Sequence, residues 1–77
     1  MGAMDQKLSV EIAHLAEADR HIAEAKERIA QQERRARSPG AETEGAQILR
    51  TMQETLAAFE EHRALILSRI ADLKSSS

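Results

Sequence analysis

One short segment, Ser38-Pro39-Gly40, is the strongest break in this chain of 77 residues, and it lies at the middle. Pro39 is the only proline, and it disfavours a helical backbone at the residue before it. The stretches on either side, of about 33 residues each, are rich in alanine, glutamate, arginine and glutamine, which are good helix formers. The sequence therefore predicts two long helices joined by a short loop, each helix about 50 Å in length.

The ends of the predicted segments follow from local composition. We interpret the opening Met-Gly-Ala as a cloning remnant, and Asp5 as the N-cap of the first helix. Arginines precede the break, and Glu42 and Glu44 follow it. The helix dipole favours cations at the C-terminus of the first helix and anions at the N-terminus of the second. The predicted segments are a remnant at 1–3, a helix at 4–37, a loop at 38–41, a helix at 42–74 and a disordered tail at 75–77, with 4–74 as a single domain.

Apolar residues recur every three and four positions in both halves, which predicts one apolar seam along each helix. Heptad position a of the first half holds Leu8, Leu15, Ile22, Ile29 and Ala36, and position d holds Glu11, Ala18, Ala25 and Gln32. In the second half, position a holds Leu49, Leu56, Arg63 and Ile70, and position d holds Gly45, Met52, Phe59, Ile66 and Leu73.

The two seams fit each other when the chain folds back so that the numbers of facing residues add up to 81. Ile22 then faces Phe59, and side-chain size falls toward the loop, where Ala36 faces Gly45. Because two separate patterns agree on one register, we predict an all-α fold, an antiparallel two-helix coiled-coil hairpin. The predicted hairpin core is Leu8, Leu15, Ile22, Ala25, Ile29, Met52, Leu56, Phe59, Ile66, Ile70 and Leu73.

Arg63 is a charged residue at a seam position. In one interpretation its aliphatic stem covers the seam while the guanidinium reaches water or an acid, with Glu17 and Asp19 as the nearest choices. In the other, the arginine forms a polar layer that fixes the register of the two helices.

A second set of small and apolar residues lies outside the seam, and it has two interpretations. Alanine can raise helix propensity on a solvated face, or the set can be a second packing surface. A chain this short rarely stabilises itself without disulfides, metal or association, and it has no cysteine. We therefore predict a homodimer that forms a four-helix bundle. The candidate oligomer interface is Ile12, Ala16, Ala23, Ala30, Ala57, Ala64, Leu67 and Ala71.

A group of arginines near the loop suggests an alternative function, a small dimeric RNA- or DNA-binding regulator. The formal net charge of −2 and the single phenylalanine argue against it, and the helix dipole alone explains cations at a helix end. We therefore do not expect nucleic acid as a partner. The candidate anion or nucleic-acid contacts are Arg28, Arg34, Arg35 and Arg37.

The histidines are the remaining candidates for chemistry. Glu11 and His14 form a Glu-x-x-His pair of the kind that holds metal in di-metal helical bundles, but no second such pair is present in the chain. His21 and His62 are predicted to approach each other across the hairpin, where imidazoles beside acids can tune assembly to pH; ordinary solvated histidines are the alternative. No glycine-rich phosphate loop is present. We expect no catalytic residue, metal or cofactor, and no enzyme.

Two segments of the chain are similar to a known group of proteins. Leu15 to Glu33 and Ile48 to Leu67 resemble short helical-hairpin proteins of rhizobia and related alphaproteobacteria. The similarity rests on Asp19, Arg20, His21, Ile22, Ala23 and Glu24, and on Thr51, Glu54, Thr55, Leu56, His62, Arg63 and Ile66. The loop differs, since Ser-Pro-Gly replaces a polar turn. The resemblance implies a bacterial hairpin and carries no assigned activity.

These observations combine into one functional expectation. No apolar run approaches the length of about 20 residues that crosses a bilayer, so we expect a cytoplasmic protein with no membrane partner. The expected partners are a second copy of the chain and, in addition, a helix of another protein laid along the hairpin. We therefore expect a non-enzymatic module for oligomerisation and protein–protein interaction.

Overall fold

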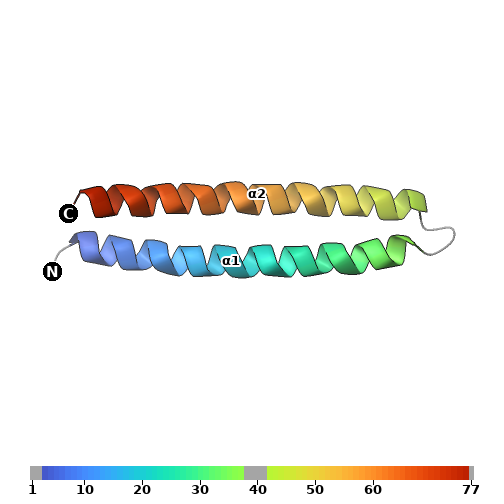
Figure 1. Cartoon of the computed structure of the whole chain (residues 1–77), viewed down its shortest axis with the longest axis horizontal. Helices are drawn as coiled ribbons and strands as arrows, with labels where there is room; N and C mark the ends of the chain where they lie inside the picture. The colour runs from blue at the N-terminus through green and yellow to red at the C-terminus, as the bar shows by residue number, and fades with distance from the viewer. Residues whose placement is uncertain (1–2, 38–41, 77) are drawn as a thin grey trace.

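Two long helices pack side by side in antiparallel directions in a computed structural model of the chain (Figure 1). The structure describes residues 3–37 and 42–76. Helix α1 spans Ala3–Ala36 and α2 spans Glu42–Ser75, each with 34 residues. The molecule measures 60 × 14 × 12 Å. The all-α hairpin predicted from the central break and the two seams is confirmed.

Burial in the hairpin follows the predicted seams. Among the described side chains, those that are buried or half-buried are the 18 residues assigned to positions a and d, and all others are exposed. Ile66 is the most completely buried, with 1% of its surface exposed, and it packs in a cluster with Ala18 and Ile70, against which Leu8 and Leu15 lie. Because each helix presents one apolar stripe, a single seam accounts for the whole interior.

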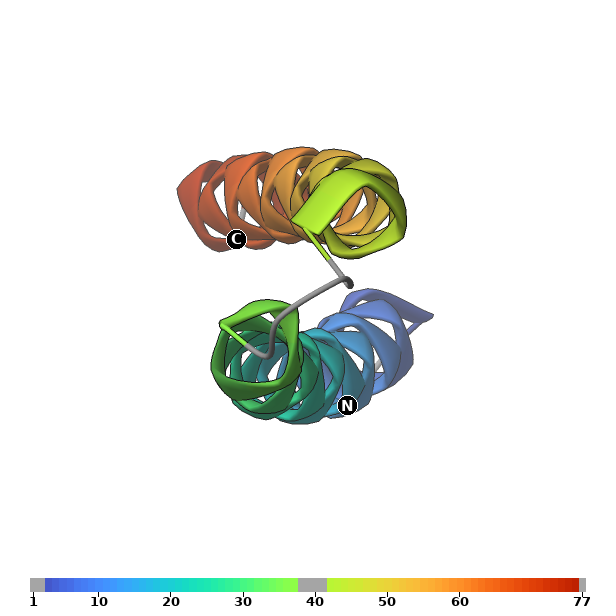
Figure 2. The same cartoon turned by 90° about the vertical axis from the view of Figure 1, so that its right-hand side faces the viewer.

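The register of the helices can be checked at the turn end. A Cβ atom built on Gly45 would lie 2.9 Å from the Cβ of Ala36, so the backbones approach there as closely as the small residues allow. Halfway along the seam, the His21 ring lies 5.5 Å from the Phe59 ring, centroid to centroid. Figure 2 shows that the two helices cross at a small angle along their length.

The ends of the helices differ slightly from the predicted segments. Helix α1 begins at Ala3, which we assigned to a remnant, and it ends at Ala36 with Arg37 in a turn. Asp5 therefore lies inside the first turn, where its charge still suits the dipole, and its prediction as an N-cap was wrong. Differences of one residue are within the spread of helix assignments.

The segment predicted as a disordered tail, 75–77, begins inside helix α2. Helix α2 continues through Ser75, and the backbone N–H of Ser76 donates to the carbonyl of Asp72 at 3.1 Å. The Ser76 hydroxyl donates to the same carbonyl at 2.9 Å. These bonds satisfy a carbonyl at the helix end that would otherwise lack a partner. The predicted loop 38–41, residues 1–2 and Ser77 lie outside the described residues.

Candidate functional site

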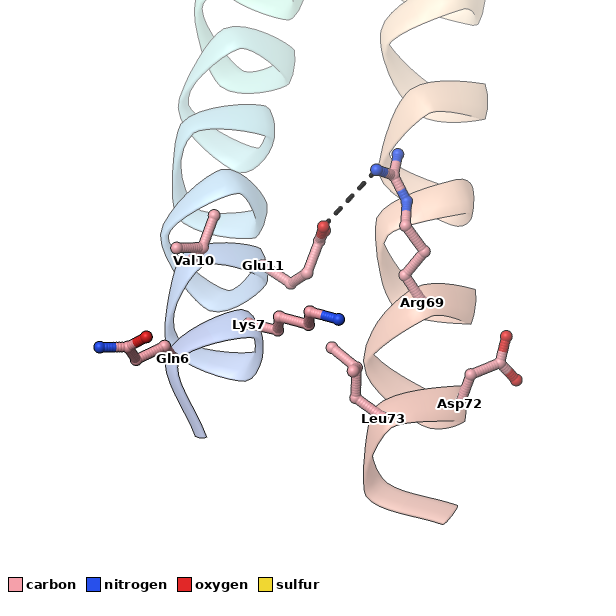
Figure 3. A pocket seen from close by; sticks show the side chains of 7 residues that line it. All are labelled: Gln6, Lys7, Val10, Glu11, Arg69, Asp72 and Leu73. Atoms are coloured by element: carbon pink, nitrogen blue, oxygen red, sulfur yellow. Dashed lines mark ion pairs between the residues drawn. The ribbon is translucent and has the colours of Figure 1, made fainter. Parts of the chain in front are cut away.

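The open end of the hairpin, where the two termini lie, carries an open groove of about 480 Å³. The heptad pattern places Glu11 in the seam, and Figure 3 shows it reaching from α1 toward Arg69 of α2. The groove is lined by Gln6, Lys7, Val10, Glu11, Arg69, Asp72 and Leu73.

Glu11 is the most buried acid for which the structure gives an ion pair, with 14% of its side chain exposed. Its Oε1 lies 3.5 Å from Nη1 of Arg69. Its Oε2 is buried and has no hydrogen-bond partner among the described residues, although Nδ1 of His14 is 3.8 Å away. The predicted Glu-x-x-His pair thus meets on one face of α1. The sequence did not predict Arg69 as a partner of Glu11.

The Glu11 site does not gather further metal ligands. Within residues 3–37 and 42–76, no group of three or more histidine, cysteine, aspartate or glutamate side chains is arranged to hold a metal ion. The ionisable groups that lie within 4 Å of the Glu11 carboxylate are the Arg69 guanidinium, at 3.5 Å, and the His14 imidazole, at 3.8 Å.

Arg63 leaves the seam on one side and forms an ion pair with Asp19 of α1. Its stem is half-buried while the charged end reaches a side chain that is 54% exposed. The prediction that Arg63 covers the seam and reaches an acid is confirmed, with Asp19 as the acid. Lys26 and Glu60 share a shallow hollow with this pair.

One of the two histidines predicted to approach each other across the hairpin has an aromatic partner. His21 of α1 packs against Phe59 of α2, with the ring planes tilted by 32°, and His62 is exposed. An aromatic contact of this kind contributes packing energy and needs no charge on the imidazole. The contact of His21 with Phe59 could have been predicted from the sequence. His21 directly precedes the seam residue Ile22, which the register places opposite Phe59.

The candidate arginines do not form one surface. All four side chains are exposed, but they occupy different heptad positions, so that Arg28 and Arg35 share one side of α1 while Arg34 and Arg37 point elsewhere. Arg28 also shares a hollow with Glu24 and Glu27. Acids beside a cation weaken its attraction for phosphate.

The residues of the candidate oligomer interface all lie on the outside of the hairpin. Ile12 is 51% exposed and Leu67 is 39% exposed, and the alanines of both stripes are exposed. In an antiparallel pair, positions e and b of both helices lie on the same side of the molecule, so these residues form one face. We call it the alanine face: Ile12, Ala16, Ala23, Ala30, Ala57, Ala64, Leu67 and Ala71. Val10, Ile48 and Leu65 are further large apolar residues exposed outside it.

Comparison with known proteins adds no relative. No protein-family model matches the chain, and neither the curated proteins nor the solved structures contain a significant match. In the described part of the chain, neither helix has an apolar stretch sufficient to cross a membrane. A function for this chain must therefore be inferred from the hairpin itself, from its seam and from its exposed alanine face.

Proposed function

We propose that this hairpin is a coiled-coil self-association module, which forms a homodimeric four-helix bundle and acts through protein–protein contacts without enzymatic activity. The observation that carries the proposal is the alanine face. The 18 seam positions are used within one hairpin, whereas Ile12 and Leu67 lie beside the seam with 51% and 39% of their surface exposed. On one face with alanines spaced by seven, they are arranged as a second packing surface.

The exposed area of the hairpin supports association. The single chain exposes 5854 Å², whereas a compact monomer of 8.5 kDa is expected to expose about 4,700 Å². The excess is comparable with the area of about 800 Å² that each partner loses in a protein–protein interface of standard size. We take a second copy of the hairpin as the partner that buries this surface, because twofold dimers are the commonest oligomers.

Sedimentation velocity over a range from micromolar to about 100 µM tests the proposal. We expect a concentration-dependent change from a mass of 8.5 kDa to twice that mass. Ala23→Leu is expected to weaken association, because a long side chain on the alanine face holds the helices apart. Ala58→Leu is the matched control, since Ala58 is exposed and lies outside the alanine face.

A monomer throughout this range would contradict self-association and would leave a helix of another protein as the occupant of the alanine face. Equal dimerisation of the wild type and Ala23→Leu would show that the chain associates through a different surface. The cytoplasmic location stays a prediction from the sequence.

A further inference from the structure

The charge on α1 changes sign near its middle. Before Ala23, the helix carries four acids and two bases; after it, three acids and four bases follow up to Ala36. The first half thus has a formal charge of −2 and the second half of +1. A helix with this distribution is attracted to a copy of itself that runs in the opposite direction.

The charged residues on either side of the exposed alanines of α1 show the same change of sign. Ala16, Ala23 and Ala30 are exposed at a spacing of seven, so they lie along one line of the helix surface. On one side of the line lie Asp19 and Lys26, and on the other lie Arg20 and Glu27, all of them exposed. Each side therefore has one acid and one base. One of the two lies three residues from Ala23 along the chain and the other lies four residues from it in the opposite direction.

A twofold axis perpendicular to α1 at Ala23 pairs these charges. The axis places Ala23 against the partner's Ala23, and Ala16 against the partner's Ala30. The same operation brings Asp19 beside the partner's Lys26, and Arg20 beside the partner's Glu27. Symmetry repeats both pairs, so four pairs of opposite charge surround a centre of alanines that lets the backbones approach closely.

We propose that the second copy docks antiparallel, α1 against α1, with Ala23 on the twofold axis and the turn end of one hairpin beside the open end of the other. This inference rests on the proposed self-association and adds its orientation. Docking of the two alanine faces about this axis also sets α2 against α2 of the other copy, where Glu54 would face the partner's Glu61, so the attraction between opposite charges comes from α1.

The parallel arrangement of two hairpins gives a poorer match. A twofold axis along the molecule would set α1 against α2 of the other copy, with Ala23 near the partner's Ala57. Asp19 would then approach the partner's Glu60, and Glu27 would approach the partner's Glu54. Arg20, near the partner's Glu61, and Asp5, near the partner's Lys74, would meet opposite charges.

Contacts within the hairpin leave these groups accessible. Arg20 is 62% exposed, and its nitrogens lie 3.8 Å from oxygens of both Glu17 and Glu24, at the outer limit of an ion pair. Asp19 binds Arg63, so a substitution at Asp19 would disturb the hairpin as well as the dimer. Arg20 and Glu27 are therefore the better positions for a test.

The test exchanges charges between two variants. Arg20→Glu alone and Glu27→Arg alone each create two contacts of like charge in the antiparallel dimer, and each is expected to dimerise about tenfold more weakly. An equimolar mixture restores both contacts of opposite charge, so heterodimers are expected with an affinity near that of the wild type. Sedimentation with one variant carrying a dye measures this, and circular dichroism checks that both variants keep their helices.

The parallel arrangement predicts a different result. Glu27→Arg would then dimerise more tightly than the wild type, because it would approach the partner's Glu54, and the mixture would be intermediate. That outcome, or equal affinities throughout, would overturn the antiparallel inference while leaving self-association intact. A wild type that stays monomeric would instead contradict the proposed function itself.

A cross-link gives an independent measurement, since the chain has no cysteine of its own. Ala23→Cys places two thiols at the axis, and oxidation is expected to yield a disulfide-linked dimer. Ala16→Cys is the matched control, because position 16 faces position 30 of the other copy; it should cross-link poorly alone and well when mixed with Ala30→Cys. Equal cross-linking of Ala16→Cys and Ala23→Cys alone would contradict the proposed axis.

Discussion

The two ends of the hairpin pack differently, although one heptad pattern runs through both. At the turn end, Ala36 and Gly45 bring the backbones so close that one added Cβ atom does not fit. At the open end, Glu11 occupies a seam position, and it borders an open groove of about 480 Å³. The difference shows that the pattern sets which residues face inward, while side-chain size and charge set how tightly each layer closes.

The largest change in stability is expected for a substitution in the buried layer next to Glu11. Ile66→Ala removes the most completely buried side chain, which is 1% exposed, and is expected to lower the free energy of unfolding by about 2–5 kcal/mol. Leu65→Ala, next in sequence and exposed, should change it by less than about 0.5 kcal/mol. Chemical denaturation at one fixed protein concentration measures both, and equal losses would contradict the assignment of the seam.

Replacing the seam acid tests whether the open end is less stable because of Glu11. Glu11→Leu removes a buried carboxylate oxygen that lacks a hydrogen bond and is expected to raise the free energy of unfolding by about 1–3 kcal/mol. The exposed Glu17 of the same helix offers the control Glu17→Leu, for which we expect little change. A loss of stability in Glu11→Leu would mean that the contacts of Glu11 with Arg69 and His14 outweigh its burial.

An added methyl group tests the close approach at the turn end. Gly45→Ala should lower stability, since overpacking costs about 1–3 kcal/mol and the better helix propensity of alanine returns only about 1 kcal/mol. Combining it with Ala36→Gly moves the methyl group across the seam and should restore stability close to that of the wild type. Thermal unfolding of the three proteins decides this, and a stabilised single variant would refute the tight contact.

The smallest effect is expected at the second charged seam residue, Arg63. A double-mutant cycle of Arg63→Met and Asp19→Asn should give a coupling of about 0.2–1 kcal/mol, because water reaches both side chains, which are 40% and 54% exposed. The coupling should shrink further in 0.5 M NaCl through screening. A coupling several times larger, independent of salt, would show that this pair fixes the register of the helices.

Much of the fold could be predicted because the heptad spacing of apolar residues within each helix decides which side chains face inward. The 3-4 pattern marked all 18 positions that are buried or half-buried among the described side chains, and the fit of one pattern to the other gave the approach of Ala36 to Gly45. The ends of the helices were predicted less well, since a single hydrogen bond, such as that from Ser76 to Asp72, extends or shortens a helix. Local composition contains little information about such bonds.

The sequence by itself determined the antiparallel hairpin and its inward face, because helical periodicity needs only the order of residues. Only the tertiary structure decided which side chains meet: Asp19 as the acid for Arg63, Arg69 beside Glu11, and Phe59 beside His21. Long side chains reach several neighbours from one backbone position, so their partners depend on the distance and rotation between the helices. These two quantities arise only when the seam has closed.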